Sequence, residues 1–153
     1  MIRRLFLGGL CLSCLMVSVG AGTVEDQFII RMREADLTGT WIPLQGGGLG
    51  VGKPDTYRVV RATRKEGERW EIVWRVSQRG QSLELPLPCK ITFAGDVAVL
   101  ILDELEMGEG RRYSARVMFH EKIYTGHWWS AGGEGGLLNG KVTTGTEVEA
   151  TGS

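Results

Sequence analysis

The segment Trp70-Glu-Ile-Val-Trp-Arg-Val-Ser-Gln-Arg-Gly-Gln-Ser-Leu-Glu-Leu-Pro-Leu87 alternates apolar and polar residues on both sides of Arg79-Gly80. Period-two alternation is typical of a strand with one buried face, and Arg79-Gly80 supplies a two-residue turn. Folding the segment about this turn places Trp74 opposite Leu85, so the apolar faces of the two halves coincide. The segment is therefore predicted to form an antiparallel hairpin.

The same agreement of faces occurs at two further turns. A turn at Gly95-Asp96 sets Phe93 against Ala98, and a turn at Glu121-Lys122 matches the strands on either side of it. Extended along the chain, the pattern predicts strands at about residues 38–45, 55–64, 69–78, 81–94, 97–105, 111–120, 123–131 and 137–147. The fold class is predicted as all-β, an eight-stranded antiparallel up-and-down β-barrel, because closure removes unpaired sheet edges.

Pro86 and Pro88 interrupt the fourth predicted strand. Proline cannot donate a hydrogen bond to a ladder, so this strand is expected to bend or break there. Ahead of the strands, Thr23 and Asp26 have the spacing of a capping box. A short helix is expected after Thr23, and a strand that begins at Phe28 is the alternative.

The first 21 residues have the pattern of a secretory signal peptide. Arg3 and Arg4 precede an apolar run that ends in small residues at Ala21. We expect cleavage after Ala21, a secreted or periplasmic barrel domain over residues 22–148, and a flexible tail over 149–153. The run is shorter than the roughly twenty residues that span a bilayer, so no stable membrane insertion is expected after cleavage; an uncleaved anchor is the alternative.

Charge and cysteine content restrict the partners. Without Arg3 and Arg4 the chain has sixteen basic and eighteen acidic residues, a net charge of −2, with both signs interspersed. No basic stripe is available for phosphates, so nucleic acid is not an expected partner. Cys89 is the single cysteine after residue 21, so no internal disulfide is expected.

The segment Leu37-Thr-Gly-Thr-Trp41, after the expected helix and before a long loop, resembles the start of the calycin barrels, the lipocalins and avidins. The close likeness covers about five residues, and the strand count extends it over the mature chain. Gly39 and Trp41 are expected to be structural anchors, with Trp41 near the closed end. The lipocalin Thr-Asp-Tyr motif is absent, and Pro43 occupies the region of the polar biotin contacts of avidins.

Up-and-down connectivity places alternate loops at one end of the barrel. The loops 45–54, 79–80, 106–110 and 132–136 share that end, and three of them are rich in glycine. They are predicted to form the mouth, with five glycines as candidate lip residues: Gly46, Gly48, Gly50, Gly133 and Gly135. The first loop approaches the phosphate-loop pattern, but Pro54 replaces its Ser/Thr and no helix follows, so a mobile lip or a plain flexible connection is expected.

Catalytic and metal chemistry has little support in the sequence. His120 and His127 are the only histidines, and the predicted register does not bring them together, so no metal site is expected. Cys89 is predicted inward as a small hydrophobe. Alternation aims Glu104 inward near the mouth, without a second acid–base group beside it. No enzymatic activity and no cofactor are expected.

Inward-facing aromatic residues are the main functional signal. Trp74, Tyr113 and Trp128, together with Glu104, are predicted to bind a small apolar or amphipathic ligand at the mouth. The alternative is a barrel filled by its aromatic side chains that serves as a structural or protein-interaction module. Four apolar residues are predicted outward, as a patch for a protein partner or self-association: Trp129, Ile123, Val99 and Ile101.

Overall fold

The structure is a computed structural model that describes residues 22–78 and 80–145. The expected signal peptide (1–21), the tail (149–153) and the end of the barrel domain after residue 145 lie outside the described residues. Within the described part of the chain, no helix has both the length and the apolar character needed to cross a membrane.

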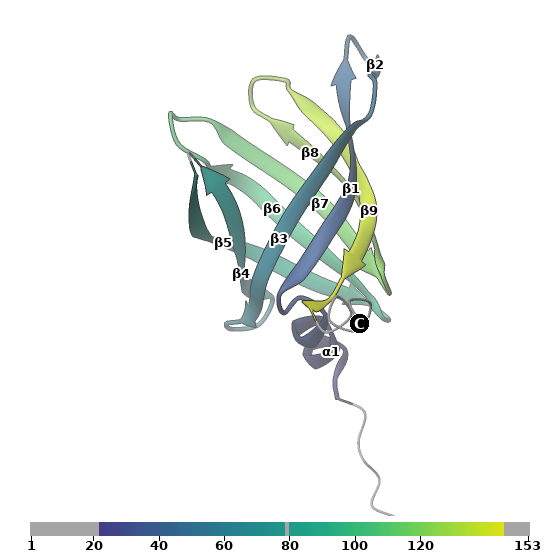
Figure 1. Ribbon diagram of the computed structural model, residues 1–153, viewed down its shortest axis with the longest axis vertical. Coiled ribbons are helices and arrows are strands. Elements are labelled where there is room, and N and C mark those ends of the chain that lie inside the picture. Colours follow the sequence, from purple (N-terminus) through teal and green to yellow (C-terminus); the bar gives the residue numbers. More distant parts are fainter. Residues whose placement is uncertain (1–21, 79, 146–153) are drawn as a thin grey trace, which may run out of the picture.

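The described residues form one helix and nine strands around a closed barrel (Figure 1). In chain order they are α1 (Val24–Arg31), β1 (Ala35–Gln45), β2 (Gly48–Leu49), β3 (Lys53–Arg64), β4 (Arg69–Gln78), β5 (Gln81–Ala94), β6 (Val97–Glu106), β7 (Arg112–His120), β8 (Ile123–Ser130) and β9 (Gly135–Thr143). Strands β3 to β9 pair antiparallel in sequence order, and β1 pairs with both β3 and β9. These eight strands form the barrel, which confirms the predicted fold class.

The predicted registers are confirmed where the structure records them. Trp74 lies opposite Leu85, and Phe93 lies opposite Ala98. Strand β2, absent from the prediction, is a two-residue strand that pairs with the end of β1 in a hairpin projecting beyond the mouth (Figure 1). The loops 106–110 and 132–136 also lie at the end opposite α1, as connectivity requires (Figure 1).

Helix α1 begins with the predicted capping box. The Thr23 hydroxyl accepts a hydrogen bond from the Asp26 backbone N–H at 3.2 Å, and the Asp26 carboxylate accepts one from the Thr23 N–H at 3.1 Å. These bonds satisfy backbone donors that a helix start leaves unpaired. The helix is therefore confirmed, and the alternative of a strand from Phe28 is wrong.

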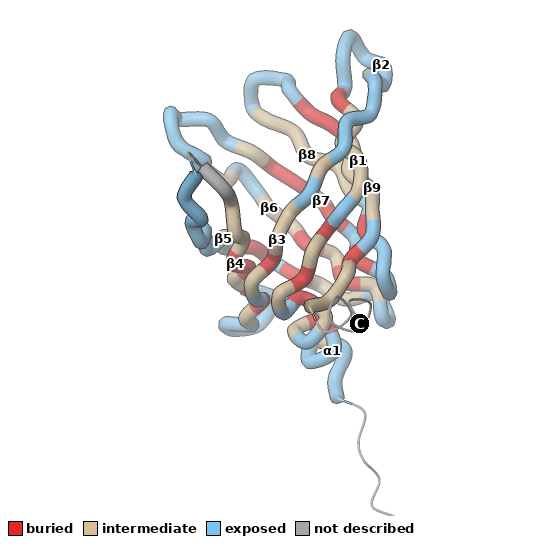
Figure 2. Tube along the Cα trace, viewed as in Figure 1, coloured by how far each residue is buried: buried red, intermediate tan, exposed pale blue. Residues whose placement is uncertain are grey.

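The Phe28 side chain of α1 packs into the closed end of the barrel. Its ring is 2% exposed and lies 5.8 Å from Trp70, 6.0 Å from Phe93 and 5.7 Å from Phe119, in edge-to-face arrangements. Met32, one turn later, is fully buried. The core is thus concentrated at the end of the barrel that α1 covers, whereas the mouth loops are largely exposed (Figure 2).

Gly39 is required where β1 meets β9. It pairs with Gly140, and a Cβ at Gly39 would collide with the carbonyl oxygen of Asn139. A Cβ at Gly140 would in turn collide with the carbonyl of Thr38. The two strands that close the barrel therefore approach too closely for side chains at this pair, which gives Gly39 a structural role.

Trp41 lies toward the mouth, so its predicted place near the closed end is wrong. Ala35, buried beside α1, begins β1, and an extended strand rises about 3.3 Å per residue, so Trp41 lies roughly 20 Å further along. The Trp41 ring lies 6.1 Å from the ring of Trp128. Its buried indole nitrogen has no hydrogen-bond partner among the described residues.

Phe28→Ala tests the importance of the aromatic floor. Because the substitution removes a buried ring that contacts three others, we expect it to lower the free energy of unfolding by about 3–5 kcal/mol. Urea unfolding followed by tryptophan fluorescence measures this change. Ile30→Ala is the matched control on the same helix, where the side chain is 65% exposed; it should cost less than about 0.5 kcal/mol. Equal effects of the two substitutions would contradict the role of Phe28.

Candidate ligand-binding cavity

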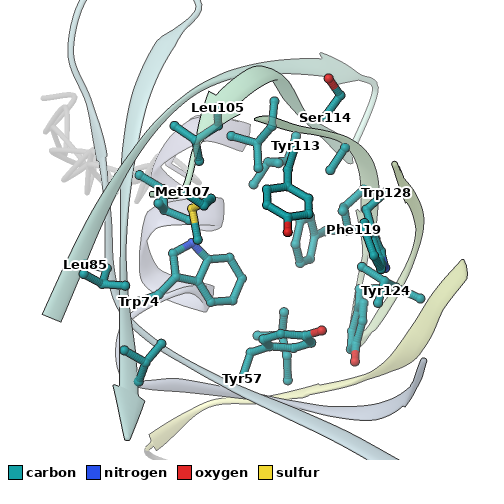
Figure 3. A pocket seen from close by; sticks show the side chains of 18 of the residues that line it. Tyr57, Trp74, Leu85, Leu105, Met107, Tyr113, Ser114, Phe119, Tyr124 and Trp128 are labelled. Atoms are coloured by element: carbon teal, nitrogen blue, oxygen red, sulfur yellow. The ribbon is translucent and has the colours of Figure 1, made fainter. Parts of the chain in front are cut away.

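The half of the barrel nearer the mouth encloses a cavity of about 680 Å³ (Figure 3). This volume lies within the range of about 300–1,000 Å³ that is usual for small-molecule sites. The predicted residues Trp74, Tyr113 and Trp128 all line it. Its other lining residues are Leu37, Thr56, Tyr57, Arg75, Val76, Leu85, Leu87, Leu100, Leu102, Leu105, Met107, Ser114, Ala115, Val117, Phe119, Tyr124 and Leu138.

The cavity exists because side-chain volume is distributed unevenly along the barrel. Phe28, Trp70 and Phe93 fill the floor, whereas the positions above it include small or aliphatic residues such as Ala115, Val117 and Leu138. Because the large rings lie at the closed end and smaller side chains lie above them, unfilled volume remains above the aromatic floor. The prediction of a filled interior is therefore correct only for the closed end.

Aromatic rings form the firm walls of the cavity. Trp74 and Tyr57 meet edge to face with centroids 5.7 Å apart, and Tyr113 lies 5.9 Å from Trp128. Figure 3 shows Trp74 on one side of the cavity and Trp128 on the other, with the Tyr113 hydroxyl between them. Such pairs are worth about 0.5–1.5 kcal/mol beyond the area they bury, which favours a preformed site.

The hairpin of β4 and β5 separates from both of its neighbours near the mouth. Pairing of β3 with β4 ends at Arg58 opposite Arg75, and pairing of β5 with β6 ends at Lys90 opposite Ile101. Among the described residues, no pairing joins Gln81–Cys89 of β5 to β6. Leu85 is exposed at this separation and also lines the cavity, so the cavity opens at the side as well as at the mouth.

Pro86 and Pro88 explain the separation of β5 from β6. Two residues separate Gln78 and Gln81, which makes them a hydrogen-bonded pair in a two-residue hairpin. Because hydrogen-bonded and non-hydrogen-bonded pairs alternate, the backbone nitrogens of Pro86 and Pro88 face β6. Neither can donate there. Of the two expected outcomes, a break of the strand is wrong: β5 is continuous from Gln81 to Ala94, but among the described residues its pairing with β6 begins only at Lys90.

Ion pairs lie on the outer surface of the barrel where β3 and β4 separate. The Arg58 guanidinium lies 2.6 Å from the Asp36 carboxylate and 3.0 Å from that of Glu34. Arg75, opposite Arg58, lies 3.5 Å from Glu34 and 3.1 Å from Glu84. Single pairs as exposed as these contribute at most about 1 kcal/mol, but together they tie β1, β3, β4 and β5 where β3 and β4 separate.

Glu104 does not point into the barrel, contrary to the prediction. A β-bulge lies between Leu102 and Leu105, and Glu104 has a backbone φ of 49°. The extra residue shifts the alternation, so Leu105 lines the cavity while the Glu104 side chain is 73% exposed and lies 3.5 Å from Arg112. The Glu104 N–H donates to the Ser114 hydroxyl at 3.0 Å, which stabilises the bulge.

Asp55, which was not predicted as a site residue, lies beside the cavity: it is not a lining residue, but it is hydrogen-bonded to Tyr57, which is. It lies two residues before Tyr57 on β3 and accepts a hydrogen bond from the Tyr57 hydroxyl. Burial, followed by this hydrogen bond to the Asp55 carboxylate, raises the pKa of Tyr57 above its ordinary value. Burial also raises the pKa of Tyr124, with a contribution from the charge of Asp55. Extending the alternation of β3 backwards from Tyr57 would have placed Asp55 inward.

The predicted lip glycines lie in the mouth loops but do not line the cavity. Gly46 and Gly133 adopt positive φ values of 56° and 84°, which glycine tolerates without a Cβ clash. Gly48 belongs to β2, Gly50 follows it, and Gly135 begins β9. These glycines shape the rim, and the walls come from the strands.

The histidines and Cys89 form no reactive group with one another. His127 lies opposite Arg116 as predicted and stacks on Trp129 at 5.0 Å, while His120 lies 3.3 Å from Asp96. Burial raises the pKa of the Cys89 thiol to about 12. Residues 22–78 and 80–145 contain no cluster of three or more His, Cys, Asp or Glu side chains that could hold a metal ion.

The residues predicted for a partner surface are not equally exposed. Ile123 is 54% exposed, whereas Val99, Ile101 and Trp129 are half-buried. Trp129 is covered partly by His127 and by the Arg116 guanidinium, which lies 5.5 Å from its ring. Partner binding through these residues stays a prediction.

Comparison with known proteins gave no match to a family model, to a curated protein or to a solved structure.

Restoring donors on β5 tests the origin of the side opening. Pro86→Val with Pro88→Val supplies two N–H groups that face β6, so we expect slower amide hydrogen exchange in residues 85–88 and 102–105. Ser82→Val is the control, because Ser82 has the same phase on β5 and already carries an N–H. Unchanged exchange in residues 102–105 of the double variant would show that the prolines are not the cause.

Proposed function

We propose that the protein binds a small apolar or amphipathic molecule inside its barrel, without catalysing a reaction. The observation that carries this proposal is the cavity of about 680 Å³, with predominantly apolar walls. Burial of apolar surface provides about 25 cal/mol per Å², so such walls favour an apolar body. The phenol hydroxyls of Tyr57, Tyr113 and Tyr124 can orient a polar group.

The architecture supports this proposal and the resemblance to calycin barrels. An eight-stranded barrel is just wide enough to hold one small ligand, as in lipocalins and streptavidin. Here the aromatic floor occupies one half, so the ligand would occupy the other. Cleavage after Ala21 would place this binding protein outside the cytoplasm.

Filling the cavity tests the proposed function. We expect the uncharged fluorophore N-phenyl-1-naphthylamine to bind saturably to the wild type, with enhanced emission on excitation near its own absorption band. Leu102→Trp adds bulk to the cavity wall and should weaken binding by at least about tenfold, equivalent to 1.4 kcal/mol. Ile101→Trp, the adjacent outward residue on β6, should leave affinity within about twofold, because surface substitutions cost little.

Two results would contradict interior binding. One is the absence of saturable binding to the wild type, and the other is equal affinity in the Leu102→Trp and Ile101→Trp variants. Either result would favour the alternative of a structural or protein-interaction module.

A further inference from the structure

The lining residues Tyr57 and Tyr124 interrupt the apolar wall of the cavity, and Asp55, which does not itself line the cavity, accepts a hydrogen bond from the Tyr57 hydroxyl; we call these three residues the polar corner. Asp55 and Tyr57 come from β3, and Tyr124 comes from β8. The Tyr57 and Tyr124 hydroxyls lie at the same side of the cavity in Figure 3. Asp55 is half-buried beside them, and its charge acts on both phenols.

The hydrogen bonds of this corner leave it rich in acceptors. The Asp55 carboxylate accepts from the Tyr57 hydroxyl and, at 3.0 Å, from the Thr56 N–H. Within residues 22–78 and 80–145, no lysine, arginine or histidine nitrogen lies within 4.0 Å of it. Tyr57 donates its only hydroxyl proton to Asp55, so it offers lone pairs to a ligand. A ligand group that meets the Tyr57 oxygen or the Asp55 carboxylate must therefore donate, whereas the Tyr124 hydroxyl can donate or accept.

The nearby cation Lys53 is directed elsewhere. Lys53 precedes Asp55 by two residues on β3, and its ammonium group lies over the Trp41 ring at 5.3 Å. Lys53, Trp41 and Asp55 all lie outside the lining residues, but Asp55 is hydrogen-bonded to a lining side chain, that of Tyr57. Arg75, which does line the cavity, is paired with Glu34 and Glu84. The Asp55 carboxylate is hydrogen-bonded to the Tyr57 phenol, and a partly desolvated carboxylate is stabilised by a cation.

We propose that the ligand carries a protonated amine on an apolar body, an inference that rests on the proposed function. The ammonium group donates hydrogen bonds to Asp55 and to the Tyr57 oxygen, while the apolar body lies among Trp74, Leu100 and Leu102. The aromatic faces add attraction for a cation. A ligand carboxylate at the same corner would be repelled by Asp55.

Three probes with the same eight-carbon chain separate head-group chemistry from apolar binding. n-Octylamine, 1-octanol and octanoate are titrated into the full-length protein at pH 7, and affinities are measured by calorimetry. We expect n-octylamine to bind at least about tenfold more tightly than octanoate, with 1-octanol between them. Asp55→Asn keeps the shape and removes the charge; it should abolish the preference for the amine and leave octanol affinity within about twofold.

Asp103→Asn is the matched control, because Asp103 is exposed and pairs outside the barrel with Arg116. It should retain the amine preference. Octanoate affinity equal to or above that of the amine, or an amine preference retained in Asp55→Asn, overturns the amine assignment and leaves the proposed function standing. If octanoate binds more tightly than the amine and Lys53→Gln abolishes that preference, the head group of the ligand binds Lys53 instead. Failure of all three probes to bind overturns both the assignment and the proposed function.

Discussion

The packing of Phe28 against Trp70, Phe93 and Phe119 is the constraint on which the rest of the structure depends. The Phe28 ring is the one that the other three rings of this layer all contact. The capping box stabilises the start of α1, the helix that carries this ring. The cavity is the space that this aromatic packing leaves unfilled. Its walls are formed by the same strands where they continue beyond the aromatic layer toward the mouth.

Much of this fold follows from short-range sequence patterns. The hairpin registers could be predicted because a one-residue slip would place an entire apolar face in water. Glu104 was misplaced because a bulge inserts one residue, and alternation carries no mark of the insertion. The cavity itself could not be predicted, because empty volume is a sum over side chains from every strand. The alternation that places Tyr57 inward also applies to Asp55, two residues earlier on β3. Its role beside the cavity, however, depends on its proximity to Tyr124, which β8 contributes.

The cavity combines two requirements that usually conflict. Apolar walls favour binding but do not fix the orientation of a ligand. A half-buried carboxylate can fix that orientation, but its burial costs desolvation free energy. The Tyr57 hydroxyl reduces this cost by donating to Asp55, and it leaves part of the carboxylate free for a donor. At the root of the β4–β5 hairpin, ion pairs on the outer surface secure the strands where backbone pairing stops. The cavity is therefore open on one side, while ion pairs on the outer surface still join the strands around it.

The prolines of β5 have a consequence beyond the route into the cavity. A strand that lacks its neighbour presents free backbone groups, and such a border invites another chain to add itself and begin an aggregate. Pro86 and Pro88 remove two donors from that border and make it a poor template for foreign strands. The gap in the wall is thus a weaker template for the addition of another strand. Replacement of these residues would be expected to influence solubility at high concentration as well as access to the interior.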